Sequence, residues 1–451
     1  MIIVDTALEQ REREGRPIRI ALVGAGYMGR GIAFQMLRTR GMRLVAIANR
    51  TLSEAVRAFQ EAGASAAHPI DSGAALDEAI EAGRPAVTDN AAALSESTQV
   101  DVVIEATGEV EFGAHVAMDA IRHRKHLVLM NAELDATIGP LLKVYADRAG
   151  IVITNADGDQ PGVIMNLYRF IQSLGFTPVL AGNIKGLQDP YRTPETQKAF
   201  ADKYHQKPRM VTSFADGTKI SMEMAVVANA TGHRAGRRGM YGPRCEHVKD
   251  ALTLFPTDQL LNGGLVDYIL GAEPSPGVFV LGYNEHPIPR RYMTYHKMGD
   301  GPFYVFYTPY HLCNFEVPIT AARAALFRDA TIAPAGPPVC EVLTVAKRDL
   351  RAGDELDGIG GFTCYGMLEN RHEFQAGDYL PMGLAQGCRL KRNLQRDEAV
   401  SYADVDIPAG RLIDVLRGEQ DRLFGAVRLP EAATPAVETH IVEQAAIASR
   451  D

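Results

Sequence analysis

The feature that most constrains the fold of this chain is a glycine-rich turn between an apolar run and a helix-compatible segment. The β-forming residues Ile18–Val23 lead into residues 24–29, GAGYMG, and residues that suit a helix follow. A strand, G-x-G-x-x-G and a helix in this order are the fingerprint of dinucleotide binding. Gly24 permits the tight turn, Gly26 lets the main chain approach a pyrophosphate, and Gly29 lets helix and strand pack closely. The helix N-terminus adds free N–H groups for the phosphates. A glycine-rich turn without a ligand is the alternative.

The end of the second apolar segment bears on the choice of cofactor. Residues 42–48 read as a strand, and Asn49, Arg50 and Thr51 follow it. An NAD-binding unit usually offers a carboxylate to the ribose hydroxyls at this point. An arginine instead attracts a 2′-phosphate and can bind it through two hydrogen bonds. The sequence therefore favours NADP(H) over NAD, with a solvated turn residue as the alternative for Arg50.

Strand-like and helix-like segments alternate through the first third of the chain. The apolar segments 101–106, 125–130 and 151–155 are separated by the helix-compatible segments 113–124 and 137–150. This alternation predicts a doubly wound parallel sheet, the Rossmann type of α/β fold, whose ligands bind at the carboxyl ends of the strands. The residues expected to bind the cofactor at that edge are Gly24, Gly26, Tyr27, Met28, Gly29, Asn49, Arg50, Thr51, Ala106, Thr107, Gly108, Asn131 and Glu133.

The pattern changes near residue 158, which predicts further domains. Residues 179–185 read as a strand, and residues 210–228 read as a β-hairpin turning at Asp216-Gly217. We expect an α+β catalytic domain with a mostly antiparallel sheet, followed by a small β-rich domain. From Pro430 onward the composition suggests a loosely held tail. The predicted domains are 1–157 with an N-terminal helix, 158–340 for catalysis and oligomerisation, 341–408, and 409–451 with a last helix and the tail.

Composition restricts the partners of the protein. The net charge of −8 and the absence of a basic cluster with interleaved aromatic residues argue against nucleic acid or an anionic membrane. No apolar run reaches the length of a membrane span, and the first 17 residues lack the apolar core of a signal peptide. The five cysteines form no C-x-x-C pair, which fits reduced thiols. We expect a cytoplasmic protein.

Two charged residues are the first candidates for catalysis. Lys185 ends a predicted strand among small residues, and a lysine in a partly closed cleft can pass a proton to a carbonyl oxygen. A surface lysine is the alternative. Glu223 is the one charge in an apolar segment predicted to be a strand, where an unpaired acid is costly. A pair with Lys185 or Arg192 would satisfy Glu223.

Two acids follow the last strand of the predicted parallel sheet. Asp157 and Asp159 could hold substrate hydroxyls or a divalent cation. The alternative is that they cap the helix that begins at Pro161. The metal content therefore stays undecided.

Cations in the second domain suit an anionic small-molecule substrate. The run 233–244, HRAGRRGMYGPR, contains Arg237 and Arg238 between glycines, so that its main chain could wrap a carboxylate or phosphate ester; Arg192 is a further candidate. A solvated basic loop is the alternative. Tyr310 and His311 look like part of a rigid wall with polar tips.

Longer motifs resemble the homoserine-dehydrogenase-like oxidoreductases with a C-terminal SAF domain, and within them the deoxyxylulose-phosphate reductoisomerase-like group. The resemblance covers about residues 17–425. The motifs that carry it include the glycine loop, EATG, LVLMNAE, EMAVVANATG, YGPR, GPFYVFYTPYHL and the SAF-type segment VAKRDLRAGDELDGIGG.

The resemblance implies a reaction and a set of site residues. Members of this group use NADPH to convert deoxyxylulose phosphate into methylerythritol phosphate for isoprenoid synthesis. It implies that Lys185, Glu223, Asn229 and the Tyr310-His311 wall line the catalytic site, and it supports Arg50 as a phosphate contact. A homodimer or homotetramer is expected.

Other functions stay open at this stage. Residues 186–194, GLQDPYRTP, differ from the lysine- and asparagine-rich turn of the reductoisomerase-like group, so a related dehydrogenase of a hydroxy acid or sugar is an alternative. An NADP-responsive binding or regulatory protein is another. A homoserine-type dehydrogenase is less favoured, because no lysine follows Asn131.

Overall fold

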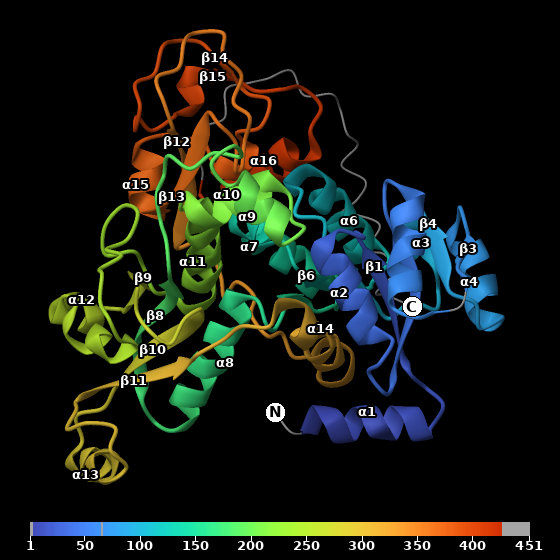
Figure 1. Cartoon of the computed structure of the whole chain (residues 1–451), viewed down its shortest axis with the longest axis horizontal. Coiled ribbons are helices and arrows are strands. Elements are labelled where there is room, and N and C mark those ends of the chain that lie inside the picture. Colours follow the sequence, from blue (N-terminus) through green and yellow to red (C-terminus); the bar gives the residue numbers. More distant parts are fainter. Residues whose placement is uncertain (1–2, 65, 426–451) are drawn as a thin grey trace.

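A computed structural model describes residues 3–64 and 66–425, and within them a seven-stranded parallel sheet forms the first layer (Figure 1). The strand order is β3-β4-β2-β1-β5-β6-β7. Apolar residues make up most of β1 and β5, which are buried because helices cover both faces of the sheet. The predicted doubly wound parallel sheet is therefore confirmed. The strands are β1 (Ile18–Val23), β2 (Met42–Ala48), β3 (His68–Pro69), β4 (Ala86–Thr88), β5 (Val102–Glu105), β6 (His126–Leu129) and β7 (Ile153–Asn155).

The helices of this region connect the strands in the order expected for such a sheet. Helix α7 starts at Ala132, five residues before the predicted start, because the Asn131 side chain caps it by accepting a hydrogen bond from the N–H of Leu134 at 3.1 Å. The helices are α1 (Ile3–Arg13), α2 (Tyr27–Met36), α3 (Leu52–Glu61), α4 (Gly73–Glu81), α5 (Ala92–Glu96), α6 (Val110–Arg122) and α7 (Ala132–Ala149).

A second, four-stranded sheet has the order β11-β10-β8-β9. Only β8 and β9 are parallel in it, so the mostly antiparallel sheet is as predicted. Its strands are β8 (Thr177–Lys185), β9 (Leu265–Leu270), β10 (Gly277–Tyr283) and β11 (Phe303–Thr308). The helices of this region are α8 (Gln160–Ser173), α9 (Lys198–Lys203), α10 (Pro208–Ala215), α11 (Thr218–Thr231), η1 (Val248–Thr253), α12 (Thr257–Leu261), α13 (Pro287–Tyr295), α14 (Cys313–Ala322) and η2 (Arg323–Phe327).

The hairpin predicted for residues 210–228 is wrong, since α10 and α11 occupy this segment. Gly217, with φ of +94°, starts α11 instead of turning a hairpin. Residues Thr218–Ala230 are all buried, because sheets, helices and the C-terminal unit surround α11. A helix that is buried on all sides shows no clear amphipathic period, so the sequence pattern did not distinguish it from a buried strand.

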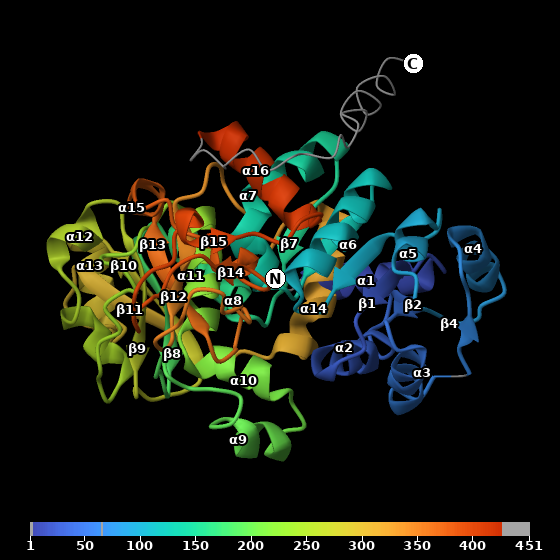
Figure 2. The same cartoon turned by 90° about the horizontal axis from the view of Figure 1, so that it is seen from above.

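Residues 340–424 form a C-terminal unit that lies above α11 and α7 (Figures 1 and 2). Its strands β12 (Cys340–Ala346) and β13 (Cys364–Asn370) pair antiparallel, as do β14 (Arg389–Leu390) and β15 (Val405–Asp406). The predicted last helix is present as α16, whereas the predicted tail from Pro430 lies outside the described residues. The helical elements of this unit are α15 (Arg371–Ala376), η3 (Met382–Leu384), η4 (Tyr402–Asp404) and α16 (Leu412–Phe424).

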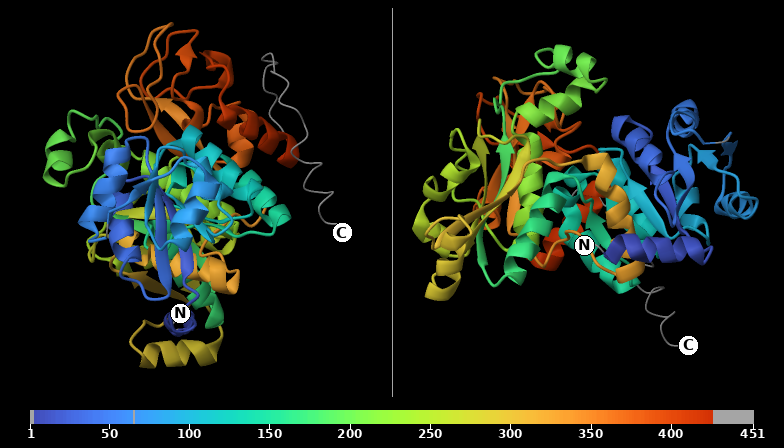
Figure 3. Two further views of the ribbon diagram at one scale, coloured as in Figure 1. Left: turned by 90° about the vertical axis from the view of Figure 1, so that its right-hand side faces the viewer. Right: turned by 60° about the horizontal axis from the view of Figure 1, so that its bottom comes forward.

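The three parts meet along α7, α8, α11 and α14. Helix α14 returns from the second sheet to pack on α2, whereas α13 projects away from the body (Figure 3). Across the described ranges, no helix combines the length and the apolar character needed to cross a membrane.

Candidate functional site

The glycine loop has the geometry that a bound dinucleotide requires. Gly24 has φ of +106°, and a Cβ there would lie 2.8 Å from the Ala106 carbonyl oxygen. A Cβ on Gly29 would lie 2.0 Å from the Gly24 carbonyl oxygen, so only glycine fits between helix and strand. At Gly26, by contrast, a Cβ would meet no atom within 4 Å. The main chain at the N-terminus of α2 is thus open where a pyrophosphate would bind.

The end of β2 presents a cation and no carboxylate. Asn49 braces the glycine loop, because its Oδ1 accepts a hydrogen bond from the N–H of Ala25 at 3.0 Å. Arg50 is exposed, and among the described residues it takes part in no ion pair or side-chain hydrogen bond. Arg30, on α2, pairs instead with Glu54 and Glu61. Arg50 is therefore available to an anionic group.

The turns after β5 and β6 continue the same edge of the sheet. The Thr107 N–H donates to Glu105 Oε1 at 2.8 Å, which fixes the turn Ala106–Gly108. A Cβ on Gly108 would lie 3.1 Å from Met210 Cε, so α10 comes up to this turn. Asn131 donates to the Glu109 carbonyl oxygen at 3.1 Å while capping α7. Both turns therefore have defined shapes beside the glycine loop.

A buried cluster of opposite charges lies at the carboxyl end of β6 and β7. Lys219 Nζ is 3.4 Å from Glu133 Oε1, 3.9 Å from Asp159 Oδ2 and 3.9 Å from Glu223 Oε1. Lys185 Nζ is 3.9 Å from the other oxygen of Glu223. Glu133 follows β6, Asp159 follows β7, Lys185 ends β8, and the remaining two belong to α11. The cluster thus joins the two sheets.

Glu223 is the centre of this cluster and is 1% exposed. Asn183 Nδ2 donates to its Oε2 at 2.9 Å. With its amide oriented to donate, Gln160 places its nitrogen 2.7 Å from both Glu223 oxygens. Burial raises the pKa of Glu223 to about 7, although Lys185 and Lys219 act in the opposite direction. This carboxyl group therefore changes its protonation state near neutral pH.

Lys219, unlike Glu223, keeps its charge at neutral pH. Burial by itself would lower the pKa of its ammonium group, but Glu133, Asp159 and Glu223 together raise it well above its ordinary value. Lys219 therefore keeps its positive charge, which makes it suited to stabilising a developing negative charge and unsuited to acting as a base.

The segment before α14 reaches the same place. His311 Nδ1 lies 3.2 Å from the Gly158 carbonyl oxygen, and burial lowers the pKa of this histidine. Cys313 Sγ is 3.4 Å from the same nitrogen, and burial raises the pKa of the thiol. Both groups are therefore neutral at pH 7. Tyr310, by contrast, is 54% exposed to solvent.

The structure brings together Lys185, Glu223, Asp159, Glu133 and His311 from the residues that the sequence singled out. Sequence reasoning missed Lys219, Asn183, Gln160 and Cys313 as members of the group. The spacing of Lys219 and Glu223, four residues apart, would have placed both on one face of a helix. Because the segment was predicted to be a strand, in which side chains repeat every two residues, the spacing of four was not read as a helix face.

Other predicted residues make contacts within the protein. Asp157 Oδ2 accepts hydrogen bonds from Thr331 at 2.8 Å and from Arg323 at 3.3 Å, which ties the turn after β7 to the segment that follows α14. Asn229 Oδ1 accepts from the N–H of Val339 at 2.7 Å, at the start of the C-terminal unit. The three arginines behave alike: Arg192 pairs with Asp189, Arg238 pairs with Glu369, and Arg237 donates to the carbonyl oxygens of Met240 and Tyr241.

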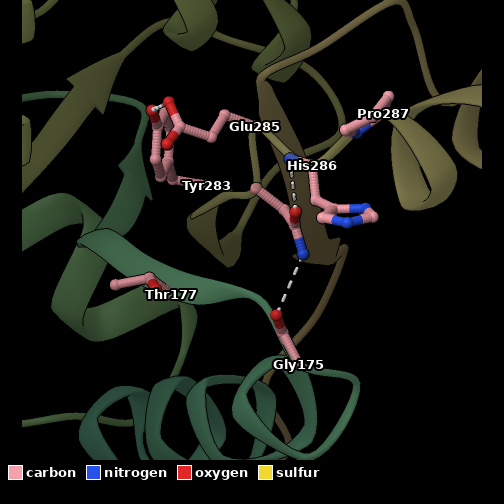
Figure 4. A pocket seen from close by; sticks show the side chains of 7 residues that line it. Gly175, Thr177, Tyr283, Glu285, His286 and Pro287 are labelled. Atoms are coloured by element: carbon pink, nitrogen blue, oxygen red, sulfur yellow. Dashed lines mark hydrogen bonds between the residues drawn. The ribbon is translucent and has the colours of Figure 1, made fainter.

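Two further features lie apart from the cluster. In residues 3–64 and 66–425, no three His, Cys, Asp or Glu side chains are grouped so that they could hold a metal ion. A surface hollow of about 600 Å³ lies between the turn after α8 and the loop before α13, lined by Gly175, Thr177 and Tyr283–Pro287 (Figure 4). The hollow contains none of the predicted site residues.

Comparison with known proteins gives two family matches. Residues 24–147 match the homoserine dehydrogenase NAD-binding domain, and residues 158–317 match the catalytic domain of oxidoreductase DRL. A search of curated proteins found no match.

Three of the matching solved structures are distant from this chain in sequence. The yvaA oxidoreductase of Bacillus subtilis is 16% identical with a TM-score of 0.28, over 38% of this chain and 44% of its own. Biliverdin reductase of Synechocystis sp. PCC 6803 is 15% identical with a TM-score of 0.35, over 65% of this chain and 80% of its own. Scyllo-inositol dehydrogenase of Lactobacillus casei is 12% identical with a TM-score of 0.35, over 60% and 74%. The chain thus spans less than half of the yvaA structure.

The glycine loop and the two matched domains identify the class of protein. A nucleotide-binding domain is followed by an oxidoreductase catalytic domain, and the charged cluster lies where the two meet. That class is a Rossmann-type nucleotide-binding domain joined to a domain that matches an oxidoreductase catalytic domain.

The contrast between Gly26 and its neighbours gives a first prediction. Gly26→Ala should fold like the wild type, because its Cβ meets no protein atom. It should weaken NADPH binding by about tenfold or more, or at least about 1.4 kcal/mol, because the methyl group fills the space that faces the pyrophosphate. The chain has no tryptophan, so NADPH fluorescence can be titrated against a low background. Gly336→Ala, equally free of contacts, is the control; unchanged binding in Gly26→Ala would contradict the assignment of the loop.

Proposed function

We propose that the protein uses NADP(H) to transfer hydride to or from a small polar carbonyl or hydroxyl compound at the Lys185–Lys219–Glu223 cluster. The observation that carries this proposal is the convergence of two lysine ammonium groups on one buried carboxyl group beside the nucleotide-binding edge. A carbonyl that gains hydride needs a positive charge near its oxygen and a group that supplies a proton.

The bound cofactor supplies the hydride, and the protein supplies the charge and the proton. In the direction of reduction, Lys219 stabilises the negative charge that develops on the substrate oxygen, because the carboxylates of Glu133 and Asp159 keep its ammonium group charged. Lys185 donates the proton to that oxygen. Glu223, 3.9 Å from Lys185, returns a proton to it, and the two amides of Asn183 and Gln160 hold Glu223 in place.

Asp159 and Glu133 complete the site. Asp159 Oδ2 is buried and accepts no hydrogen bond, so it can accept one from a substrate hydroxyl. Glu133 supports Lys219 from the side of the cofactor, since it follows β6. These two acids would thus orient the substrate while Lys185 and Lys219 face its oxygen.

Arg50 supports NADP(H) in preference to NAD(H). Its guanidinium group is exposed and unpaired among the described residues, and no acid stands at positions 49–51 to repel a 2′-phosphate. A guanidinium group can bind a phosphate through two hydrogen bonds.

Two classes of substrate are compatible with this proposed reaction. Reductive isomerisation of a sugar phosphate, such as deoxyxylulose phosphate, is the sharper version of the proposal. Simple oxidation or reduction of a hydroxy acid or sugar is the alternative. Arg192 and Arg238 do not decide between these substrates, because both are paired within the protein. A homo-oligomer and the SAF-like character of residues 341–408 stay predictions. A panel of sugar phosphates, keto acids and neutral hydroxyketones, assayed by NADPH consumption, would separate these substrates and would also expose a protein that binds NADPH without turnover.

The role of Lys185 can be tested with any substrate that the panel yields. Lys185→Met should lower kcat by about 100-fold or more, the usual contribution of a general acid, while the Kd of NADPH stays within about twofold. Lys198→Met, on the surface of α9, is the matched control. Full turnover by Lys185→Met would contradict the proton-transfer role.

The raised pKa of Glu223 predicts a pH dependence. Below about pH 7 the carboxyl group is protonated and can return a proton to Lys185, whereas above it the proton is lost. The kcat for carbonyl reduction should therefore fall as pH rises through about 7, and Glu223→Gln should abolish that titration. Glu195→Gln, an exposed glutamate, is the control. An unchanged profile in Glu223→Gln would assign the titration to another group.

The preference for NADP(H) gives a further prediction. Arg50→Ala should raise the Kd of NADPH about tenfold through loss of a charged hydrogen-bonded contact, with little effect on NADH. Arg43→Ala, exposed on β2, is the control. Equal losses for both cofactors would show that Arg50 does not contact the 2′-phosphate.

A further inference from the structure

A buried lysine of the C-terminal unit connects that unit to the catalytic part of the chain. Lys347 directly follows β12 and is 4% exposed. Its Nζ donates to Asp216 Oδ2 at 2.8 Å, to the Arg192 carbonyl oxygen at 2.9 Å and to the Gly361 carbonyl oxygen at 2.8 Å. An ammonium group has three hydrogens, so all of its donors are used and none is left for a ligand. Lys347 therefore acts on the protein itself.

The first of these contacts fixes the start of α11. Asp216, 1% exposed, stands two residues before the helix, and its Oδ1 accepts a hydrogen bond from the N–H of Thr218 at 2.9 Å. Lys219 is the next residue. The pair of Lys347 and Asp216 thus sets the position of the turn from which the catalytic helix begins.

The second contact fixes the loop that follows Lys185. Arg192 is seven residues beyond the end of β8, and the Asp189 N–H in the same loop donates to the Ala215 carbonyl oxygen at 2.8 Å. Tyr191 adds a hydrogen bond from its hydroxyl to Asp397 Oδ2 at 2.7 Å. The chain segments that carry Lys185 and Lys219 are therefore joined through one ammonium group of the C-terminal unit.

Strand β13 supports the same helix from the side. The Gly366 N–H donates to Thr218 Oγ1 at 2.9 Å, and Ser221 Oγ donates to the Gly366 carbonyl oxygen at 3.3 Å. With 3.6 residues per turn, Thr218 and Ser221 lie on the side of α11 roughly opposite Lys219 and Glu223. The C-terminal unit thus packs against the side of α11 opposite Lys219 and Glu223. Figure 1 shows β13 beside α11.

The geometry points to Lys347 as a positioning residue for hydride transfer, through which the C-terminal unit holds Lys185 and Lys219 at the separation that the reaction needs. This inference rests on the proposed function of the two lysines. It gives the C-terminal unit a role in catalysis although, among the described residues, the charged cluster draws none of its members from that unit.

The test uses the full-length protein with two variants and a control. Lys347→Met removes the three hydrogen bonds of the ammonium group but leaves Asp216 buried without its partner. The double variant Lys347→Met with Asp216→Asn is therefore made as well, because it also removes the charge of Asp216. Lys391→Met, an exposed lysine of the same unit, is the control. Each protein is assayed for kcat and KM, for the Kd of NADPH, and for amide hydrogen exchange in residues 186–192 and 215–224.

The double variant should lose at least about tenfold in kcat with KM and the Kd of NADPH within about twofold, and both segments should exchange faster than in the control. If Lys347→Met alone fails to fold, the double variant decides by the same criteria. A double variant with kcat within about twofold of the wild type, or with unchanged exchange in the two segments, would overturn the inference. Hydrogen exchange needs no substrate, so it decides the positioning claim even if Lys185→Met were to keep full activity and the proposed function failed.

Discussion

The rest of the site depends on the ion pairs that Lys219 makes with three buried acids. Three acids from three different elements, Glu133, Asp159 and Glu223, surround one ammonium group that is almost fully buried. A buried charge is costly unless it is paired, so these groups hold one another in their positions. Burial raises the pKa of Glu223 to about 7, although Lys185 and Lys219 act in the opposite direction. A fixed positive charge and a titrating acid thereby stand side by side.

The fold brings this cluster together by joining two sheets and a helix. The order β1-β5-β6-β7 carries the cofactor-binding edge from the glycine loop to Glu133 and Asp159. The second sheet delivers Lys185 at the end of β8, and α11 crosses between them with Lys219 and Glu223. Because α11 is buried along its length, its position is set by packing on α7, α8 and the C-terminal unit.

The sequence was informative wherever a local pattern has one structural meaning. The glycine loop, Arg50 after β2 and the strand–helix alternation each depend on neighbours in the chain, and the fold that they predicted is confirmed. The segment 210–228 was misread because an apolar run without a period fits a buried helix as well as a buried strand. That error hid Lys219. The contacts of Arg238 and Asp157, which join residues more than 100 positions apart, could not be read from local patterns at all.

A crystal structure of the protein with NADP⁺ bound tests the position of the charged cluster most directly. The pyrophosphate should lie on residues 24–29, and C4 of the nicotinamide should face Lys185 and Lys219. Between C4 and the two ammonium groups there should be room for a reacting carbon about 3–3.5 Å from C4. A nicotinamide ring that points away from the cluster, or that is separated from Lys219 by packed side chains, would contradict a role of these lysines in hydride transfer.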